Sequence, residues 1–200
     1  ILLGNGHYII HISKIMTAML ALKYGNMDDV VTITQENLDL ESGSQVCGFW
    51  AGDQVTMDQL LHCLLVYSGN DAASAIATHV GGSTEGFVEM MNAKAKELGL
   101  VNTHFTNASG LHDPNHYSCP RDMAIIGAAL LAEGGENLLA ITSTYDAYIR
   151  EDSDQQFWLV NTNKLIKQLE GADGLKTGYT SQAGSCITLS VRRNGLRLIG

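Results

Sequence analysis

The chain has 200 residues, of which 45% are hydrophobic and 16% charged, which is enough for one large domain with a sizeable buried core. Its net charge of −9, without a basic stripe, argues against nucleic acid as the main partner. No apolar run approaches the roughly 18 residues of a membrane span, so we expect no membrane contact within this chain.

The four cysteines are scattered through the chain without a C-x-x-C pair, so zinc-finger spacing is absent. We interpret Cys47, Cys63, Cys119 and Cys186 as buried free thiols, which behave as small hydrophobic groups, and a disulfide stays the open alternative. Two histidine pairs with a spacing of four have no third ligand at a fitting distance along the chain. We therefore expect no metal and no other cofactor.

Residues 14–24 form the first strong pattern, which is apolar on nearly all sides and is followed by Gly25 as a C-cap. A helix without a polar face belongs in the middle of a domain. Residues 30–34 are β-branched and predict a short strand.

The middle of the chain predicts a block of helices. Thr56 and Gln59 form a capping box for a helix that ends before Ser68. An alanine-rich helix over 71–80 and a helix capped by Ser83 that runs to Leu98 follow. Residues 101–120 have turn chemistry, and residues 121–132 form a further amphipathic helix.

The C-terminal part changes character. Residues 157–160 predict a strand and residues 162–169 a short helix, and the alternating runs 184–192 and 196–199 flank the hairpin signal Asn194-Gly195. A helical block between two β-containing ends predicts an α+β, or mixed α/β, fold. The expected antiparallel sheet is built from both chain ends with the helices packed on it.

Three short motifs stand in an order that is more specific than any one of them. They are Ser13-Lys14 at the start of the buried helix, Ser68-Gly69-Asn70 at the end of a helix, and Lys176-Thr177-Gly178, expected before a strand. A serine hydroxyl is a weak nucleophile that needs a neighbouring base. A lysine amine serves as this base when burial and nearby positive charge keep it neutral.

The trio resembles the S-x-x-K, S-D-N and K-T-G signature of penicillin-recognising serine enzymes. Residues 67–73, 105–113 and 173–180 are similar to D-alanyl-D-alanine carboxypeptidases of the low-molecular-mass penicillin-binding type. The resemblance implies a β-lactamase/transpeptidase-like fold. It also implies a serine peptidase that removes the terminal D-alanine of peptidoglycan stem peptides ending in D-Ala-D-Ala, through an acyl-enzyme, and that β-lactam antibiotics inhibit.

The resemblance also implies roles for individual residues. Lys14 is the expected base, Ser68 relays a proton, Asn70 holds the substrate backbone and Lys176 supplies positive charge, so these four are the catalytic candidates. The substrate-binding candidates are Thr177 for the substrate carboxylate, Gly178 for close approach, and Tyr179 on the strand that lines the peptide.

One position departs from the family pattern. The nucleophilic serine should precede the lysine by three residues, but His11 stands there and Ser13 is adjacent to Lys14. Either the nucleophile is absent, as in a catalytically silent peptidoglycan- or penicillin-binding homologue, or a segment such as Ala-Ser-Xaa is missing between Ile12 and Ser13. A third alternative makes Ser13 or His11 an unusual nucleophile.

We expect residues 1–200 to be one penicillin-binding catalytic domain, truncated at its C-terminus and lacking residues near 12–13. By resemblance, it acts outside the cytoplasm, in the periplasm or on the outer face of the bacterial membrane. Any membrane attachment would depend on a segment that this chain does not contain. A β-lactamase is a weaker alternative, because no loop with a deacylating glutamate is recognisable.

Overall fold

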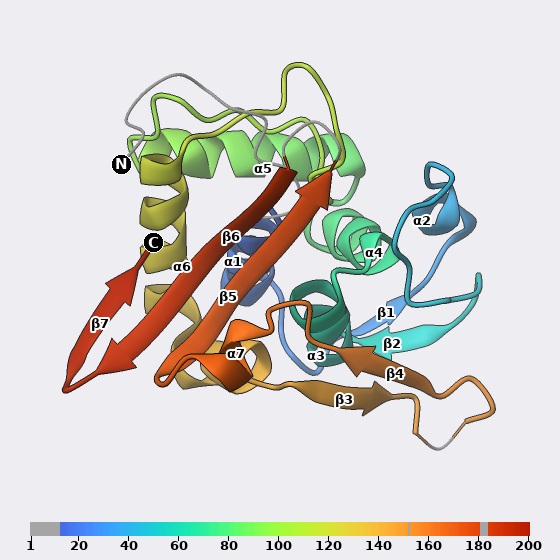
Figure 1. Cartoon of the computed structure of the whole chain (residues 1–200). Helices are drawn as coiled ribbons and strands as arrows, with labels where there is room; N and C mark the ends of the chain where they lie inside the picture. Colours follow the sequence, from blue (N-terminus) through green and yellow to red (C-terminus); the bar gives the residue numbers. More distant parts are fainter. Residues whose placement is uncertain (1–12, 152, 181–183) are drawn as a thin grey trace.

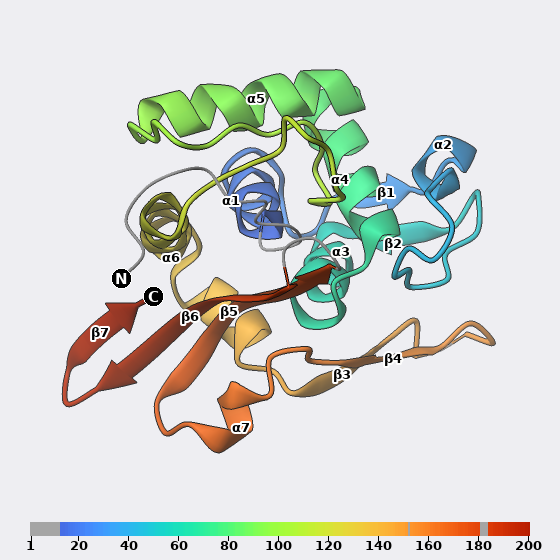
Figure 2. The same ribbon diagram turned by 45° about the horizontal axis from the view of Figure 1, so that its top comes forward.

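The computed structural model describes residues 13–151, 153–180 and 184–200. Helix α1 (Lys14–Tyr24) lies in the middle of the molecule. It packs against α3 (Met57–His62), α4 (Asn70–Gly81), α5 (Thr84–Glu97) and α6 (Pro120–Thr142), which surround it (Figures 1 and 2). The sequence-based expectation of a central helix that is apolar on nearly all sides is confirmed.

The main sheet has three described strands in the order β5 (Ala172–Thr180), β6 (Gly184–Arg193), β7 (Leu196–Ile199), all antiparallel (Figure 1). The expected hairpin at Asn194-Gly195 is present, with Arg193 paired to Leu196. Both turn residues have positive φ, which an Asn-Gly pair adopts readily.

Two small antiparallel sheets lie beside the helical block. One pairs β1 (Val30–Thr32) with β2 (Gln54–Thr56), and the other pairs β3 (Asp146–Ile149) with β4 (Phe157–Val160). The short helices α2 (Gln35–Leu38) and α7 (Leu165–Gln168) complete the described elements, together with the π-helical turn η1 (Cys63–Tyr67) that continues α3.

Side-chain caps set where the helices of the middle block begin. Thr56 accepts a hydrogen bond from the Gln59 N–H, and the Gln59 side chain accepts one from the Thr56 N–H, which completes the expected capping box of α3. Ser83 accepts from the Gly86 N–H at the start of α5.

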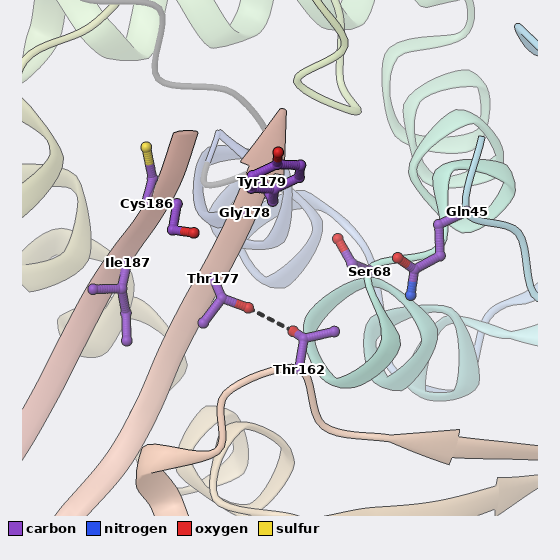
Figure 3. Close-up of a pocket in the computed structure, with 9 residues that line it drawn as sticks. Gln45, Ser68, Thr162, Thr177, Gly178, Tyr179, Cys186 and Ile187 are labelled. Carbon is purple, nitrogen blue, oxygen red and sulfur yellow. Dashed lines mark hydrogen bonds between the residues drawn. The ribbon is translucent and has the colours of Figure 1, made fainter. Parts of the chain in front are cut away.

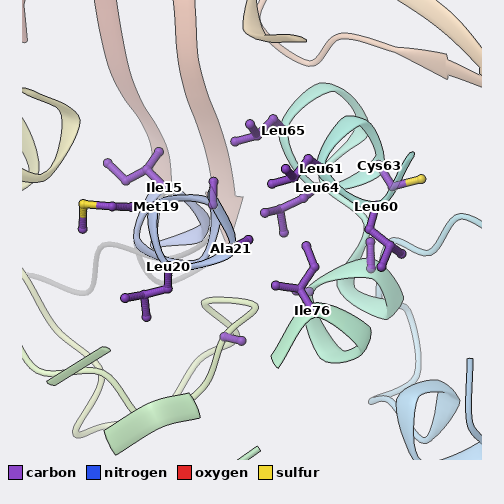
Figure 4. Close-up of a cluster of buried hydrophobic side chains, with 14 of the residues drawn as sticks. Ile15, Met19, Leu20, Ala21, Leu60, Leu61, Cys63, Leu64, Leu65 and Ile76 are labelled. Carbon is purple, nitrogen blue, oxygen red and sulfur yellow. The ribbon is translucent and has the colours of Figure 1, made fainter. Parts of the chain in front are cut away.

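The hydrophobic core surrounds α1. Residues 14–21 are all buried, and their apolar side chains meet the leucines of α3 and η1 and residues of α4 (Figure 4). A fully buried helix start matters for function, because any polar side chain on it loses contact with water.

Helix α6 is longer than the sequence suggested, because it continues past Ala132 to Thr142 through a break at Gly135, whose φ is 51°. Within the described residues it is the one helix long and apolar enough to cross a membrane. It packs against α1 and all three described strands of the main sheet.

Two expectations need correction or lie outside the described residues. The K-T-G motif lies inside β5 rather than before a strand, with Thr177 paired to Ile187 of β6. The helices pack on the sheet as expected, since β6 and β7 contact α6 and β5 contacts both α6 and α1. All described strands of the main sheet come from the C-terminal part, and the expected N-terminal contribution falls on residues 1–12, outside the description.

The contact between α6 and the sheet is closest at Gly127. A Cβ there would lie 3.1–3.2 Å from side-chain atoms of Leu175, Thr188 and Ile199. We expect Gly127→Leu to separate α6 from the sheet and to lower the free energy of unfolding by about 1–3 kcal/mol. Ala128→Leu, on the exposed side of the same turn, should change it by less than about 0.5 kcal/mol. Urea denaturation of both variants checks this, and equal effects would contradict it.

Candidate active site

The Ser68 loop joins η1 to α4 in a strained conformation. Ser68 is a non-glycine residue with a left-handed backbone (φ 75°), which is uncommon outside turns and functional sites. Gly69 follows because a side chain would not fit: its Cβ would lie 2.6 Å from Cys47 Sγ and 2.9 Å from Asp71 Oδ1. The loop therefore presents Ser68 and Asn70 at a fixed spacing, with Asn70 as the first residue of α4.

The amine of Lys14 connects α1 to this loop. Its Nζ donates hydrogen bonds to Asn70 Oδ1 at 2.7 Å and to the Ser109 carbonyl oxygen at 2.6 Å. Since Lys14 donates to the oxygen of the Asn70 amide, the NH₂ group of that amide faces the other way. This Nδ2 atom is buried and has no hydrogen-bond partner among the described residues.

The electrostatic environment favours a neutral Lys14. Burial, and then the positive charge of the nearby Lys176, hold the pKa of Lys14 well below its ordinary value. A neutral amine carries one lone pair that can accept a proton. Lys14 can therefore act as a general base.

Strand β5 provides the opposite wall. Lys176 Nζ donates to the Thr177 carbonyl oxygen at 2.8 Å and to Thr162 Oγ1 at 3.4 Å, and Thr177 Oγ1 donates to Thr162 Oγ1 at 2.7 Å. The backbone of Thr162 is in turn tied to η1, because its N–H donates to the Val66 carbonyl oxygen. Burial lowers the pKa of Lys176 to about 7, so this amine titrates near neutral pH.

A cavity of about 520 Å³ lies between the two walls (Figure 3). Ser68 and Gln45 line one side, and strands β5 and β6 line the other. The lining residues are Gln45, Ser68, Thr162, Thr177, Gly178, Tyr179, Ser185, Cys186 and Ile187. Of the predicted site residues, Ser68, Thr177, Gly178 and Tyr179 therefore share this cavity.

Lys176 and Asn70 are placed differently. Lys176 is buried and reaches the cavity wall through its contacts with Thr162 and Thr177. Asn70 lines a neighbouring cavity of about 310 Å³ together with Ser109, the second partner of Lys14. The predicted catalytic residues thus lie at the junction of two cavities rather than in one.

Ser13 is occupied on the other side of α1. Its Oγ lies 2.8 Å from His116 Nε2, while His116 Nδ1 accepts a hydrogen bond from the Thr106 N–H. Burial lowers the pKa of His116 to about 4, so the ring is neutral at pH 7. With Nδ1 accepting, the proton resides on Nε2, and His116 donates to Ser13. A serine that accepts from histidine is not activated as a nucleophile.

Three residues of the site were not singled out from the sequence. Thr162 was expected only as the start of a short helix, yet its hydroxyl connects Lys176 and Thr177. Gln45 comes from an irregular loop, and its side chain donates to the Tyr67 carbonyl oxygen beside Ser68. Ser109 contributes a backbone carbonyl, which no side-chain pattern reveals, although Asn107-Gly110 was recognised as a turn.

The other sequence-based expectations have mixed outcomes. Cys47, Cys63 and Cys119 are buried free thiols, as expected, whereas Cys186 is only half-buried and lines the cavity. Among residues 13–151, 153–180 and 184–200, no group of three or more His, Cys, Asp and Glu residues could hold a metal ion. The expected break between Ile12 and Ser13 lies outside the described residues, as does His11.

Comparison with known proteins identifies the family. The model of the D-alanyl-D-alanine carboxypeptidase family, Peptidase S11, matches residues 5–200. The chain belongs to this family. It is therefore related to serine-type peptidases, in agreement with the resemblance of its three motifs.

Relatives of the Peptidase S11 family cover nearly the whole chain. The D-alanyl-D-alanine carboxypeptidase DacF of Bacillus subtilis is 45% identical over 192 residues, which are 94% of this chain and 48% of DacF. DacC of Escherichia coli is 35% identical over 201 residues, again 94% of this chain and 48% of the relative. The chain thus spans about half the length of these curated relatives.

The fold is that of the same family. The Streptomyces K15 DD-transpeptidase has a TM-score of 0.89 and 31% identity, and the match covers 98% of this chain and 79% of that structure. A mixed fold of helices and an antiparallel sheet, as in the penicillin-binding proteins, is confirmed.

The buried His116 predicts a pH dependence of stability. Its pKa is lowered from 6.5 to about 4 in the folded chain, so between these values the unfolded chain binds a proton that the folded chain resists. Stability should therefore be full above pH 6.5 and decrease by up to about 3 kcal/mol as the pH falls toward 4.

Unfolding measurements across this pH range check the expectation. His116→Gln should remove most of the dependence of the unfolding free energy on pH. His112→Gln changes an exposed position of the same loop and should keep this dependence. A slope that persists in His116→Gln would show that another group is responsible.

Proposed function

We propose that the chain is the catalytic domain of a serine-type D-Ala-D-Ala carboxypeptidase. The observation that carries the proposal is the buried amine of Lys14, which donates to Asn70 Oδ1 and the Ser109 carbonyl oxygen and whose pKa is held well below its ordinary value by burial. A lysine in this state has a lone pair for the proton of a hydroxyl nucleophile. The names of the relatives support the same activity.

The reaction proceeds in two steps. A hydroxyl oxygen attacks the carbonyl carbon between the two D-alanines, and its proton passes to Lys14. When the C–N bond breaks, the leaving amine takes up a proton, for which Ser68 is the relay beside the cavity. Water then cleaves the resulting ester, with the Lys14 amine again as the base, and the shortened peptide is released.

Two groups suit the ends of such a substrate. The terminal carboxylate fits Thr177 and the positive charge of Lys176 on β5, because a charged donor close to a carboxylate gives a strong hydrogen bond. The carbonyl of the preceding residue fits Asn70 Nδ2, a buried donor without an acceptor among the residues that the structure describes. Gly178 and Tyr179 line the β5 side of the larger cavity.

The nucleophile is the missing part. The family places it three residues before the lysine, where this sequence has His11. An imidazole at that position would give an acyl adduct that hydrolyses readily, and Ser13 is engaged by His116. We infer that the chain with this sequence binds stem peptides and β-lactams reversibly, and that a serine three positions before Lys14 completes the enzyme.

The biological setting follows from the same proposal. The partners are the peptidoglycan stem peptide and β-lactam antibiotics, and the site of action is outside the cytoplasm. Residues 1–200 act as a single catalytic domain.

Inserting Ala-Ser-Ala between Ile12 and Ser13 tests the proposal directly, because it places a serine three residues before Lys14. We expect the unmodified chain to show no covalent adduct with benzylpenicillin. The insertion variant should gain the mass of one penicillin molecule, measured by intact-protein mass spectrometry. Insertion of Ala-Ala-Ala is the matched control and should stay unlabelled.

Two outcomes would contradict these expectations. If the unmodified chain forms a long-lived, stoichiometric adduct, the nucleophile is already present, and Ser13 is the first residue to substitute. If the Ala-Ser-Ala variant folds, as judged by circular dichroism, but is not acylated, Lys14 does not act as the proposed base.

The titration of Lys176 predicts how substrate binding depends on pH. With a pKa of about 7, the amine is charged below neutral pH and neutral above it. The affinity for a peptide ending in D-Ala-D-Ala should therefore decrease as the pH rises through 7, by roughly tenfold or more. The same peptide with a C-terminal amide should show no such decrease.

Calorimetric titration of both peptides between pH 5.5 and about 9 measures how the affinity changes with pH. This range lies on both sides of the pKa of Lys176. Lys176→Met should abolish the preference for the free carboxylate, whereas Lys167→Met, an exposed lysine on α7, should preserve it. A preference that survives in Lys176→Met would assign the carboxylate to another group.

A further inference from the structure

Two of the buried cysteines lie together beside the Ser68 loop. Cys47 belongs to the irregular segment before β2, and Cys63 is the first residue of η1, which ends directly before Ser68. Both side chains are fully buried, and the two thiols share a hydrogen bond. The Cys63 side chain points away from the side chains of α1, whereas Leu64 points toward them (Figure 4). Neither thiol has a role in the proposed reaction.

The two cysteines hold Gly69 from two sides. The Gly69 N–H donates to the Cys63 carbonyl oxygen at 2.9 Å, and a Cβ on Gly69 would lie 2.6 Å from Cys47 Sγ. The backbone of Cys47 is fixed as well. Its N–H donates to Asp71 Oδ2 at 2.7 Å, and its carbonyl oxygen accepts from Arg150 Nη2 at 3.2 Å. A bond between the two sulfurs would therefore join the segments on both sides of this loop.

The arrangement meets the main requirement for a disulfide. Two cysteines can be bridged without moving the backbone only if their side chains already lie close together and point toward each other. The hydrogen bond between the thiols of Cys47 and Cys63 places them in this way. In the structure both are free thiols, so the fold accommodates the reduced pair and holds it ready for oxidation.

The oxidation is a thiol–disulfide exchange with a small disulfide as the oxidant. The Cys47 thiolate attacks one sulfur of the oxidant, whose S–S bond breaks, and the leaving thiolate takes up the proton that Cys47 released. The Cys63 thiolate then attacks the mixed disulfide at the Cys47 sulfur, and the second thiol leaves with the proton of Cys63. The chain loses two hydrogen atoms and gains one S–S bond, while the oxidant is reduced to two thiols.

The folded chain should react slowly. The hydrogen bond with Cys63, and then burial, raise the pKa of the Cys47 thiol, so little thiolate is present near neutral pH. Cys47 lies between α2 and β2 in a segment without helix or strand, and its neighbours Val46 and Gly48 are exposed. Local opening of this segment is the route by which an oxidant reaches the thiol. The bond should therefore form fastest while the chain folds.

We propose that Cys47 and Cys63 are a modification site, at which a small disulfide oxidant converts the two thiols into an intramolecular disulfide that fastens the Ser68 loop. The proposal goes beyond the proposed function, since it needs neither substrate nor nucleophile. The cross-link restricts the unfolded chain, so the oxidised chain should melt about 5–10 °C higher than the reduced chain. Hydrogen exchange of the Gly69 and Asn70 amides, which donate to the two joined segments, should become slower.

The test refolds the chain from urea at about pH 8, with either glutathione disulfide or dithiothreitol present. Intact-protein mass spectrometry of the oxidised sample should show the loss of two hydrogen atoms. Peptide mapping after the free thiols are blocked should find residues 47 and 63 joined. A sample that is oxidised in the folded state should form the same cross-link more slowly. Thermal unfolding and amide exchange are then compared between the oxidised and reduced samples.

Cys47→Ala and Cys63→Ala should each abolish the rise in melting temperature. Cys119→Ala is the matched control, because it removes a buried cysteine at the start of α6 and should keep the rise. Circular dichroism checks that each variant folds, and the comparison of the oxidised with the reduced unmodified chain needs no substitution. A cross-link between another pair, glutathione adducts in its place, or an oxidised chain that melts no higher than the reduced chain would overturn the proposal.

Discussion

The Lys14 amine lies in the interior against two carbonyl oxygens, and most of the site depends on this contact. Removing an amine from water is unfavourable, so it stays buried only with fixed partners. Those partners come from residues 56 and 95 positions away in the chain. Asn70 is fixed because it starts α4. Ser109 is fixed because Asn107 Oδ1 accepts from Gly110, Leu111 and Ser109 itself, which stiffens the loop.

The loop around Ser68 is held from its other side by a buried carboxylate. Asp71 Oδ2 accepts a hydrogen bond from the Cys47 N–H, and the Asn70 N–H donates to the Gln45 carbonyl oxygen. These two hydrogen bonds hold the 45–47 segment against the start of α4. Gln45 thereby reaches the cavity next to Ser68. Burial raises the pKa of Asp71, while the backbone N–H groups that it accepts oppose this shift. The same carboxylate therefore shapes the rim of the cavity and contributes negative charge near Lys14.

The sequence predicted the parts of this arrangement that depend on local chemistry. The apolar helix at 14–24, the capping box at Thr56 and the Asn194-Gly195 hairpin follow from residue type and spacing, and all three are present. Contacts between segments that are distant in the chain could not be predicted from the sequence. The Thr162 hydroxyl and the Ser109 carbonyl became visible only when the segment after β4 was placed against Lys176 and the 107–111 loop against Lys14.

The charge of Lys176 also reaches across the site to Lys14. After burial, it is the second cause that holds the pKa of Lys14 below its ordinary value. An anion bound at Lys176 would offset that charge and make Lys14 more basic. Under the proposed function, the carboxylate end of a bound peptide would therefore strengthen the proposed base. This coupling exists without any nucleophile, because it belongs to the two amines and the fold that buries them.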